Sequence, residues 1–124
     1  DQAIAPLIAR PNSTINEIFK KIVLQGGEYK ATIVNPYSGI PLQVSRNERA
    51  VGQISFAFIQ NEPNLRALSI SGEEARFDNR FYPISRPLYL LTKSEPPAEV
   101  KEFIEWVLSE EGQKILKRLF IGAK

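Results

Sequence analysis

The chain has 124 residues, 43% of them hydrophobic and 24% charged, which is typical of one globular domain with a single core. Because it contains no His and no Cys, the usual general base at neutral pH and the common transition-metal ligands are absent, and we expect neither an enzyme nor a metal or cofactor site. The net charge of +2 comes from basic residues scattered along the sequence rather than gathered on one stripe, which argues against nucleic acid as a partner.

The first predicted elements are a strand and a helix. Residues 6–10 favour a short buried strand that ends in turn-forming residues. Thr14 and Glu17 have the spacing of a capping box, in which a hydroxyl and a carboxylate reciprocally satisfy free helix amides. Apolar residues then recur at helical spacing until Gly26 and Gly27, which predict the end of the helix.

The later elements follow the same signals, with alternating apolar residues for strands and helical spacing for helices. The expected strands are residues 31–34, 53–59, 65–70 and 88–92, and the expected helices are residues 38–47, 100–108 and 115–120. The early alternation of strand and helix predicts parallel strands joined by crossover helices. We therefore expect one α/β domain over residues 1–124, with a mixed central sheet of about five strands and helices on both faces.

Neither a membrane span nor a targeting peptide is predicted. The longest apolar run, residues 54–59, contains a Ser and is far too short to cross a bilayer. The first residues show no signal peptide and no initiator Met. We therefore expect a mature or trimmed chain, with any signal segment outside this sequence.

The last third of the chain carries the most informative pattern. Residues 82–92 form a predicted strand with prolines near its start. Residues 100–114 follow it with a helix, a Ser break and a Glu-Gly-Gln step into a second helix. This order resembles the C-terminal signature of the phosphate-type solute-binding proteins of ABC transporters. Residues 10–19, 50–56 and 65–72 are similar to other stretches of that family, so the resemblance covers nearly the whole chain.

The resemblance implies a single lobe of a type 2 periplasmic-binding-protein-like fold, corresponding to the family's second lobe and its C-terminal helices. It implies a solute-binding protein, or a derived domain, for phosphate or a similar oxyanion. Such a protein works outside the cytoplasm (in the periplasm, secreted or anchored at the cell surface) with ABC-transporter membrane subunits. The family's first lobe has no counterpart in this sequence. The alternative is therefore a single-lobe interaction or scaffold module that has lost small-ligand binding.

The resemblance also implies an anion site at the first helix, where the family has a Ser-Gly-Thr loop. Ser13 takes the place of the motif's Ser and Thr14 that of its Gly, whereas Arg10 stands one position after the place of its Arg. Free amides and the positive end of the helix dipole favour an anion there. A second helix start follows residues 35–37, and both helix starts can also be ordinary capped helices that bind nothing. The candidate binding residues are Arg10, Asn12, Ser13, Thr14, Ser38 and Gly39.

The apolar residues of the expected C-terminal helices indicate an interface. Their apolar residues, such as Phe103 and Phe120, would form a patch larger than a monomer normally exposes. The helices must therefore fold back on their own sheet or dock on a second copy of the chain. We expect a homodimer through these helices, because a twofold dimer is the commonest homo-oligomer.

Overall fold

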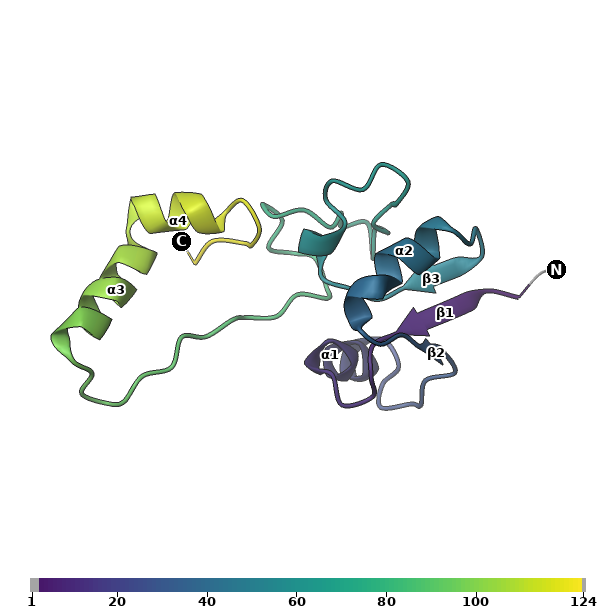
Figure 1. Ribbon diagram of the computed structural model, residues 1–124, viewed down its shortest axis with the longest axis horizontal. Helices are drawn as coiled ribbons and strands as arrows, with labels where there is room; N and C mark the ends of the chain where they lie inside the picture. The colour runs from purple at the N-terminus through teal and green to yellow at the C-terminus, as the bar shows by residue number, and fades with distance from the viewer. Residues whose placement is uncertain (1–2, 124) are drawn as a thin grey trace. The chain divides into compact units, whose positions relative to one another are not determined.

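The computed structural model describes residues 3–123 and divides into two compact units, one reaching to Leu68 and the other beginning at Ser69 (Figure 1). The first unit contains β1 (Ala5–Ile8), α1 (Thr14–Ile22), β2 (Thr32–Ile33), the 3-10 helix η1 (Tyr37–Gly39), α2 (Ile40–Ser45), β3 (Ala50–Gly52) and the 3-10 helix η2 (Phe56–Phe58). The second unit contains α3 (Ala98–Leu108) and α4 (Glu110–Leu116). Within residues 3–123, no helix combines the length and the apolar character needed to span a bilayer.

The three strands form a parallel sheet in the order β2-β1-β3. Leu7 of the central strand pairs with Thr32 on one side and with Gly52 on the other. The chain leaves β1 through α1 to reach β2, and it then crosses back through α2 to reach the opposite edge. Because such crossovers are right-handed, this reversal places α1 and α2 on opposite faces of the sheet, as Figure 1 shows. The expected parallel strands and crossover helices on both faces are confirmed.

The core of the first unit lies between the sheet and α2. Its centre is Ile40, the first residue of α2, whose side chain is fully buried. Leu7 of β1 and Val34 after β2 are buried against it. The hydrophobic residues that pack around this centre while partly buried are Val44, Ala50 and Ile54. Residues from β1, from α2 and from the segment after β2 thus meet in one cluster.

Gly52 marks the closest approach of α2 to the sheet. A Cβ atom at Gly52 would overlap Cγ2 of Ile40 and lie 3.0 Å from Cγ2 of Val44. We expect Gly52→Ala to lower the free energy of unfolding by about 1–3 kcal/mol, because an overpacked core forces its neighbours to shift. Gly39→Ala is the matched control, since its Cβ would meet Val34 Cγ1 at an ordinary 3.5 Å. Urea unfolding followed by circular dichroism compares the two variants, and equal stabilities would contradict this packing.

A hydrogen-bonded corner joins α3 to α4 in the second unit. Ser109 ends α3 and is the N-cap of α4, where its Oγ accepts a hydrogen bond from the Gly112 N–H at 3.3 Å. The buried side chain of Gln113 donates from Nε2 to the Val107 carbonyl at 2.8 Å. Its Oε1 accepts the N–H of Ala123, also at 2.8 Å. Because Ser109 caps α4, this helix begins at Glu110, earlier than the expected residue 115.

The sheet is smaller than the sequence predicts. Among the described residues it has three parallel strands, not about five in a mixed arrangement. Residues 53–59 contain η2 rather than a strand, and residues 65–70 contribute only an isolated bridge from Ile70 to Glu73. Residues 88–92 pair with no strand in residues 3–123. Alternating apolar residues are compatible with a strand, but a strand forms only where a neighbouring backbone is available for pairing.

Candidate functional site

The loop before α1 lies at the carboxyl end of the central strand. The connections that leave β1 and reach β3 run on opposite faces of the sheet, so the ends of these two strands form a switch point in the topology. In open α/β sheets, ligands bind at such points, outside the carboxyl ends of the strands. The fold therefore places Arg10, Asn12, Ser13 and Thr14 where sheets of this kind bind ligands.

This loop forms a shallow, open depression of about 440 Å³, lined by Arg10, Pro11, Asn12 and Ser13. Arg10 is exposed and makes no ion pair with any described residue. A guanidinium group that is not neutralised by a carboxylate suits an oxyanion, to which it can donate two parallel hydrogen bonds. Nothing comparable is available for a metal ion, because residues 3–123 contain no group of three His, Cys, Asp or Glu side chains able to hold one.

The start of α1 presents donors that the protein itself does not use. Ser13 is the N-cap, with an extended backbone (φ −74°, ψ 133°), and its hydroxyl makes no capping hydrogen bond. Its carbonyl accepts the N–H groups of Asn16 at 2.9 Å and Glu17 at 3.3 Å, so the predicted capping box that starts at Thr14 is wrong. The N–H groups of Thr14 and Ile15 donate to no acceptor in the described part of the chain. The positive end of the helix therefore has free donors.

Asn16 holds this loop in place from inside the protein. Its side chain is 1% exposed, and its Nδ2 donates to the carbonyls of Ala9 and Arg10, both at 2.8 Å. The Oδ1 atom is buried with no hydrogen-bond partner among the described residues. The sequence analysis missed Asn16, although an Asn in the first turn of a helix is a residue type that often bonds nearby backbone groups.

Two further residues tie the first turn of α1 to the end of β3, and both were missed as well. Gln53 donates from Nε2 to the Ile15 carbonyl at 2.5 Å. The Tyr29 hydroxyl lies 2.8 Å from the Asn16 carbonyl and 3.1 Å from Gln53 Oε1. Burial raises the pKa of Tyr29, and the hydrogen bond to Gln53 offsets part of this effect. These contacts join residues far apart in sequence, so no local sequence pattern predicts them.

The second candidate pair is not brought into the depression. Ser38 and Gly39 lie in η1, after β2 and thus at the same carboxyl edge of the sheet, but neither lines the depression. The Gly39 N–H already donates to the Pro36 carbonyl at 3.0 Å, and Ser38 is exposed. A binding role for this pair stays a prediction.

The known proteins similar to this chain are all named for phosphate binding or phosphate transport. No family model matches the chain. Over 92 residues, which are 71% of this chain, it is 30% identical to the phosphate-binding protein PstS 2 of Streptococcus agalactiae, in a serotype V and a serotype III strain. A phosphate-binding protein of a phosphate ABC transporter from Streptococcus pneumoniae matches 99% of this chain, with a TM-score of 0.80 and 25% identity. A Clostridium perfringens structure with bound phosphate, assigned as a phosphate ABC transporter substrate-binding protein, matches 98% with a TM-score of 0.77 and 29% identity.

The chain is similar to phosphate-binding proteins over most of its length. It covers 31% of each curated relative and 52% of each solved chain, so it spans about half the length of the solved relatives. The structural matches confirm the expected α/β fold of a single lobe. They also confirm the resemblance to the phosphate-type family that was inferred from the C-terminal pattern.

Proposed function

We propose that this chain is a phosphate-related solute-binding lobe and that its anion site is the loop at the start of α1. The observation that carries the proposal is the set of unused donors at the carboxyl end of β1: the Arg10 guanidinium, the Ser13 hydroxyl and the first amides of α1. Relatives named as phosphate-binding proteins supply the ligand class. As part of such a protein, the chain would work outside the cytoplasm with the membrane subunits of an ABC transporter, as a binding protein and not as an enzyme.

The chemistry expected of this site follows from its donors. An oxyanion at the helix start would accept hydrogen bonds from the Thr14 and Ile15 amides and gain from the helix dipole. Arg10 would add charge-assisted hydrogen bonds, which are about twice as strong as neutral ones. The depression is open, so water competes for the ligand, and we expect a dissociation constant between about 1 μM and 1 mM for phosphate.

Arg10 tests the site directly. We expect Arg10→Ala to weaken phosphate binding by about 10-fold or more, because it removes a charge-assisted contact. Arg46→Ala is the matched control, since Arg46 is also exposed, lies in the same unit and makes no described ion pair. Calorimetric titration with phosphate, sulfate and molybdate measures both variants, and NMR shifts of the Thr14 and Ile15 amides locate the ligand. If both variants lost the same amount of phosphate affinity, the anion would be attracted by the overall positive charge and not by a specific site.

The alternative function is an interaction or scaffold module that no longer binds a small ligand. One observation favours it: Thr14 and Ile15 replace the Gly and Thr of the family motif, so a glycine and a hydroxyl donor are lost. No calorimetric heat and no amide shift with any of the three oxyanions would support this alternative.

Two statements about organisation stay predictions. The first is that residues 1–124 form one domain. The second is the homodimer through the C-terminal helices, α3 and α4. Light scattering at micromolar concentration tests the dimer, for which we expect twice the 14.0 kDa of one chain.

A further inference from the structure

A second depression, of about 400 Å³, lies within the unit that begins at Ser69. Its lining comes from a loop and from the end of α4 with the turn that follows, and it consists of Phe77, Asp78, Arg80, Lys117, Ile121 and Gly122. Pockets for small ligands commonly have volumes of about 300–1,000 Å³. The depression is open to solvent and shares no residue with the candidate anion site before α1. Its chemistry therefore needs an explanation of its own.

The two cations of this depression, Arg80 and Lys117, form no ion pair with any residue in the range 3–123. Asp78 also lines the depression, but its Oδ1 lies 3.1 Å from Nε of Arg76. The Glu74 carboxylate lies 3.5 Å from Nη1 of the same guanidinium. These two carboxylates therefore bind Arg76 and not Arg80, and both cations of the depression are available to an anion from solution.

Gly122 holds both cations in place. Arg80 donates from Nη2 to the Gly122 carbonyl at 3.2 Å, across 42 positions of sequence. The Lys117 side chain lies against the same glycine, where a Cβ atom would be 3.1 Å from Cγ and 2.5 Å from Cε of Lys117. Side chains that are already held lose less conformational freedom when a ligand binds. The depression is therefore pre-organised for a negatively charged group.

The end of α4 does not present its last carbonyls to such a group. The carboxyl end of a helix carries partial negative charge on its free carbonyls, which would disfavour an anion. The carbonyls of Ile115 and Leu116, however, accept the N–H groups of Arg118 and Phe120 at 3.2 and 2.9 Å. The positive side chains of the lining are thus not opposed by these two carbonyls.

The apolar part of the lining indicates which kind of anion fits. Phe77 is half-buried and Ile121 is 37% exposed, so both have apolar surface to offer. An inorganic oxyanion has no group to place against these side chains, whereas an ester of phosphate with an apolar alcohol has one. A phosphate monoester carries about −1.5 to −2 charges at neutral pH, which matches two cations better than the single charge of a carboxylate.

We propose that this depression binds a phosphate monoester with an apolar alcohol part. Arg80 and Lys117 would bind the phosphate group, and the apolar part would lie against Phe77 and Ile121. Arg80 has five N–H donors, and only one of them is needed for the Gly122 carbonyl. Lys117 would add a compact charge with three donors. The proposal does not rest on the anion site before α1, because it uses none of its residues.

NMR titration of the whole chain with phenyl phosphate tests the proposal. We expect the ligand to shift the amide signals of Gly122 and Ala123, which lie in the turn beside the two cations. Inorganic phosphate should bind there about tenfold more weakly, because it buries no apolar surface. Phenylacetate should also bind about tenfold more weakly, because it carries one negative charge and the same ring.

Three variants separate this site from general attraction. We expect Arg80→Gln and Lys117→Gln each to weaken phenyl phosphate binding by about tenfold or more. Lys114→Gln is the matched control, since it removes an exposed cation of α4 that does not line the depression, and its effect should stay below about twofold. Arg80→Gln also removes the bond to Gly122, so Lys117→Gln decides the result if that variant does not fold. Arg10→Ala should leave the Gly122 shift unchanged.

Four results would overturn the proposal. Shifts confined to the start of α1 would mean that the second depression binds nothing. Equal affinities for phenyl phosphate and inorganic phosphate would show that the apolar lining contributes nothing, and equal affinities for phenyl phosphate and phenylacetate would show that the site does not select phosphate. Equal losses in Lys117→Gln and Lys114→Gln would mean that the overall positive charge attracts the ligand.

Discussion

Replacing Gly112 by Ala is expected to destabilise the helix corner of the second unit, although Ala is the better helix former. A Cβ atom at Gly112 would overlap the Trp106 carbonyl oxygen and lie 2.7 Å from that of Val107. Both are backbone atoms, and neither can swing away as a flexible side chain would. The Trp106 carbonyl also accepts the N–H and the hydroxyl of Ser109, at 3.0 and 2.6 Å, so moving it disturbs the cap of α4.

Two opposing effects decide the sign of this change. Ala gains about 1 kcal/mol over Gly in an open helix. Overlap with fixed neighbours costs typically about 1–3 kcal/mol, and more where backbone must shift. Because Gly112 is buried against backbone on one side, we expect the cost of the overlap to exceed the gain in helix propensity. The free energy of unfolding should fall by about 2 kcal/mol.

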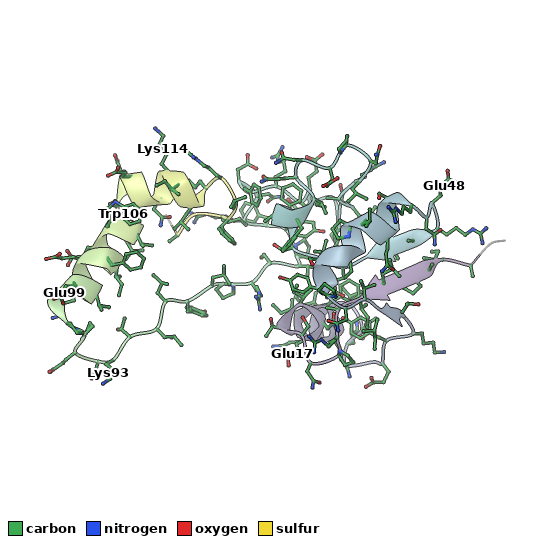
Figure 2. The ribbon with its side chains drawn as sticks, viewed as in Figure 1. Glu17, Glu48, Lys93, Glu99, Trp106 and Lys114 are labelled. Atoms are coloured by element: carbon green, nitrogen blue, oxygen red, sulfur yellow. The ribbon has the colours of Figure 1, made fainter. Side chains whose placement is uncertain are left out.

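The measurement has a built-in reporter. Trp106 is the single Trp of the chain and lies on α3 beside the corner (Figure 2), so its fluorescence in urea follows the second unit. Lys114→Ala is the control, since Lys114 is an exposed residue of the same helix and should change stability by less than about 0.5 kcal/mol. A Gly112→Ala protein as stable as the original would show that the corner is open enough for a side chain.

The contrast between the predicted and observed elements has a physical basis. The units β1-α1 and β2-α2 were predicted because a local run of apolar residues decides each element. The predicted end of the first helix at Gly26 and Gly27 was too late, because α1 ends at Ile22. The stretch 88–92 also has the composition of a strand, yet it has no neighbour to pair with among the described residues. The local sequence determines whether a segment prefers the strand conformation. Whether a strand forms also depends on a neighbouring strand, which a distant part of the sequence must supply.

The candidate site, like the fold, could be predicted only in part from the local sequence. Its position after the first strand was predicted, and the structure keeps Arg10 and Ser13 together in one depression. The residues that fix the loop were not predicted. Gln53 reaches Ile15 across 38 positions of sequence, and Tyr29 reaches Asn16 across 13. Spacing rules act within a few residues, so such contacts can be found only in the folded chain.

Asn16 should be the most sensitive residue of the first unit. Its Nδ2 group supplies the hydrogen bonds that hold the carbonyls of Ala9 and Arg10 at the end of β1. Asn16→Ala would leave a buried carbonyl without its donor and open a small cavity. We expect this change to lower the free energy of unfolding by about 2–4 kcal/mol.

Asn16→Asp makes the test sharper, because it keeps the shape and replaces the donor by a carboxylate. That carboxylate would be buried facing two carbonyl oxygens, and both effects raise its pKa in the folded state above the ordinary value of about 3.9. At pH values below the unfolded pKa, both states are protonated and the electrostatic penalty is absent. The penalty grows as the pH rises toward the folded pKa and is fully present above it.

We therefore expect the stability difference between Asn16→Asp and the original chain to be largest at neutral pH and to shrink in acid. At neutral pH it should reach about 3 kcal/mol, since a buried carboxylate without a partner is strongly unfavourable. Asn12→Asp adds the same charge at an exposed position of the same loop, so its difference should stay below about 0.5 kcal/mol. Urea unfolding at several pH values, with both variants compared to the original chain at each pH, measures this. A difference for Asn16→Asp that does not change with pH would show that Asn16 is not held against these carbonyls, and the loop would then need another support.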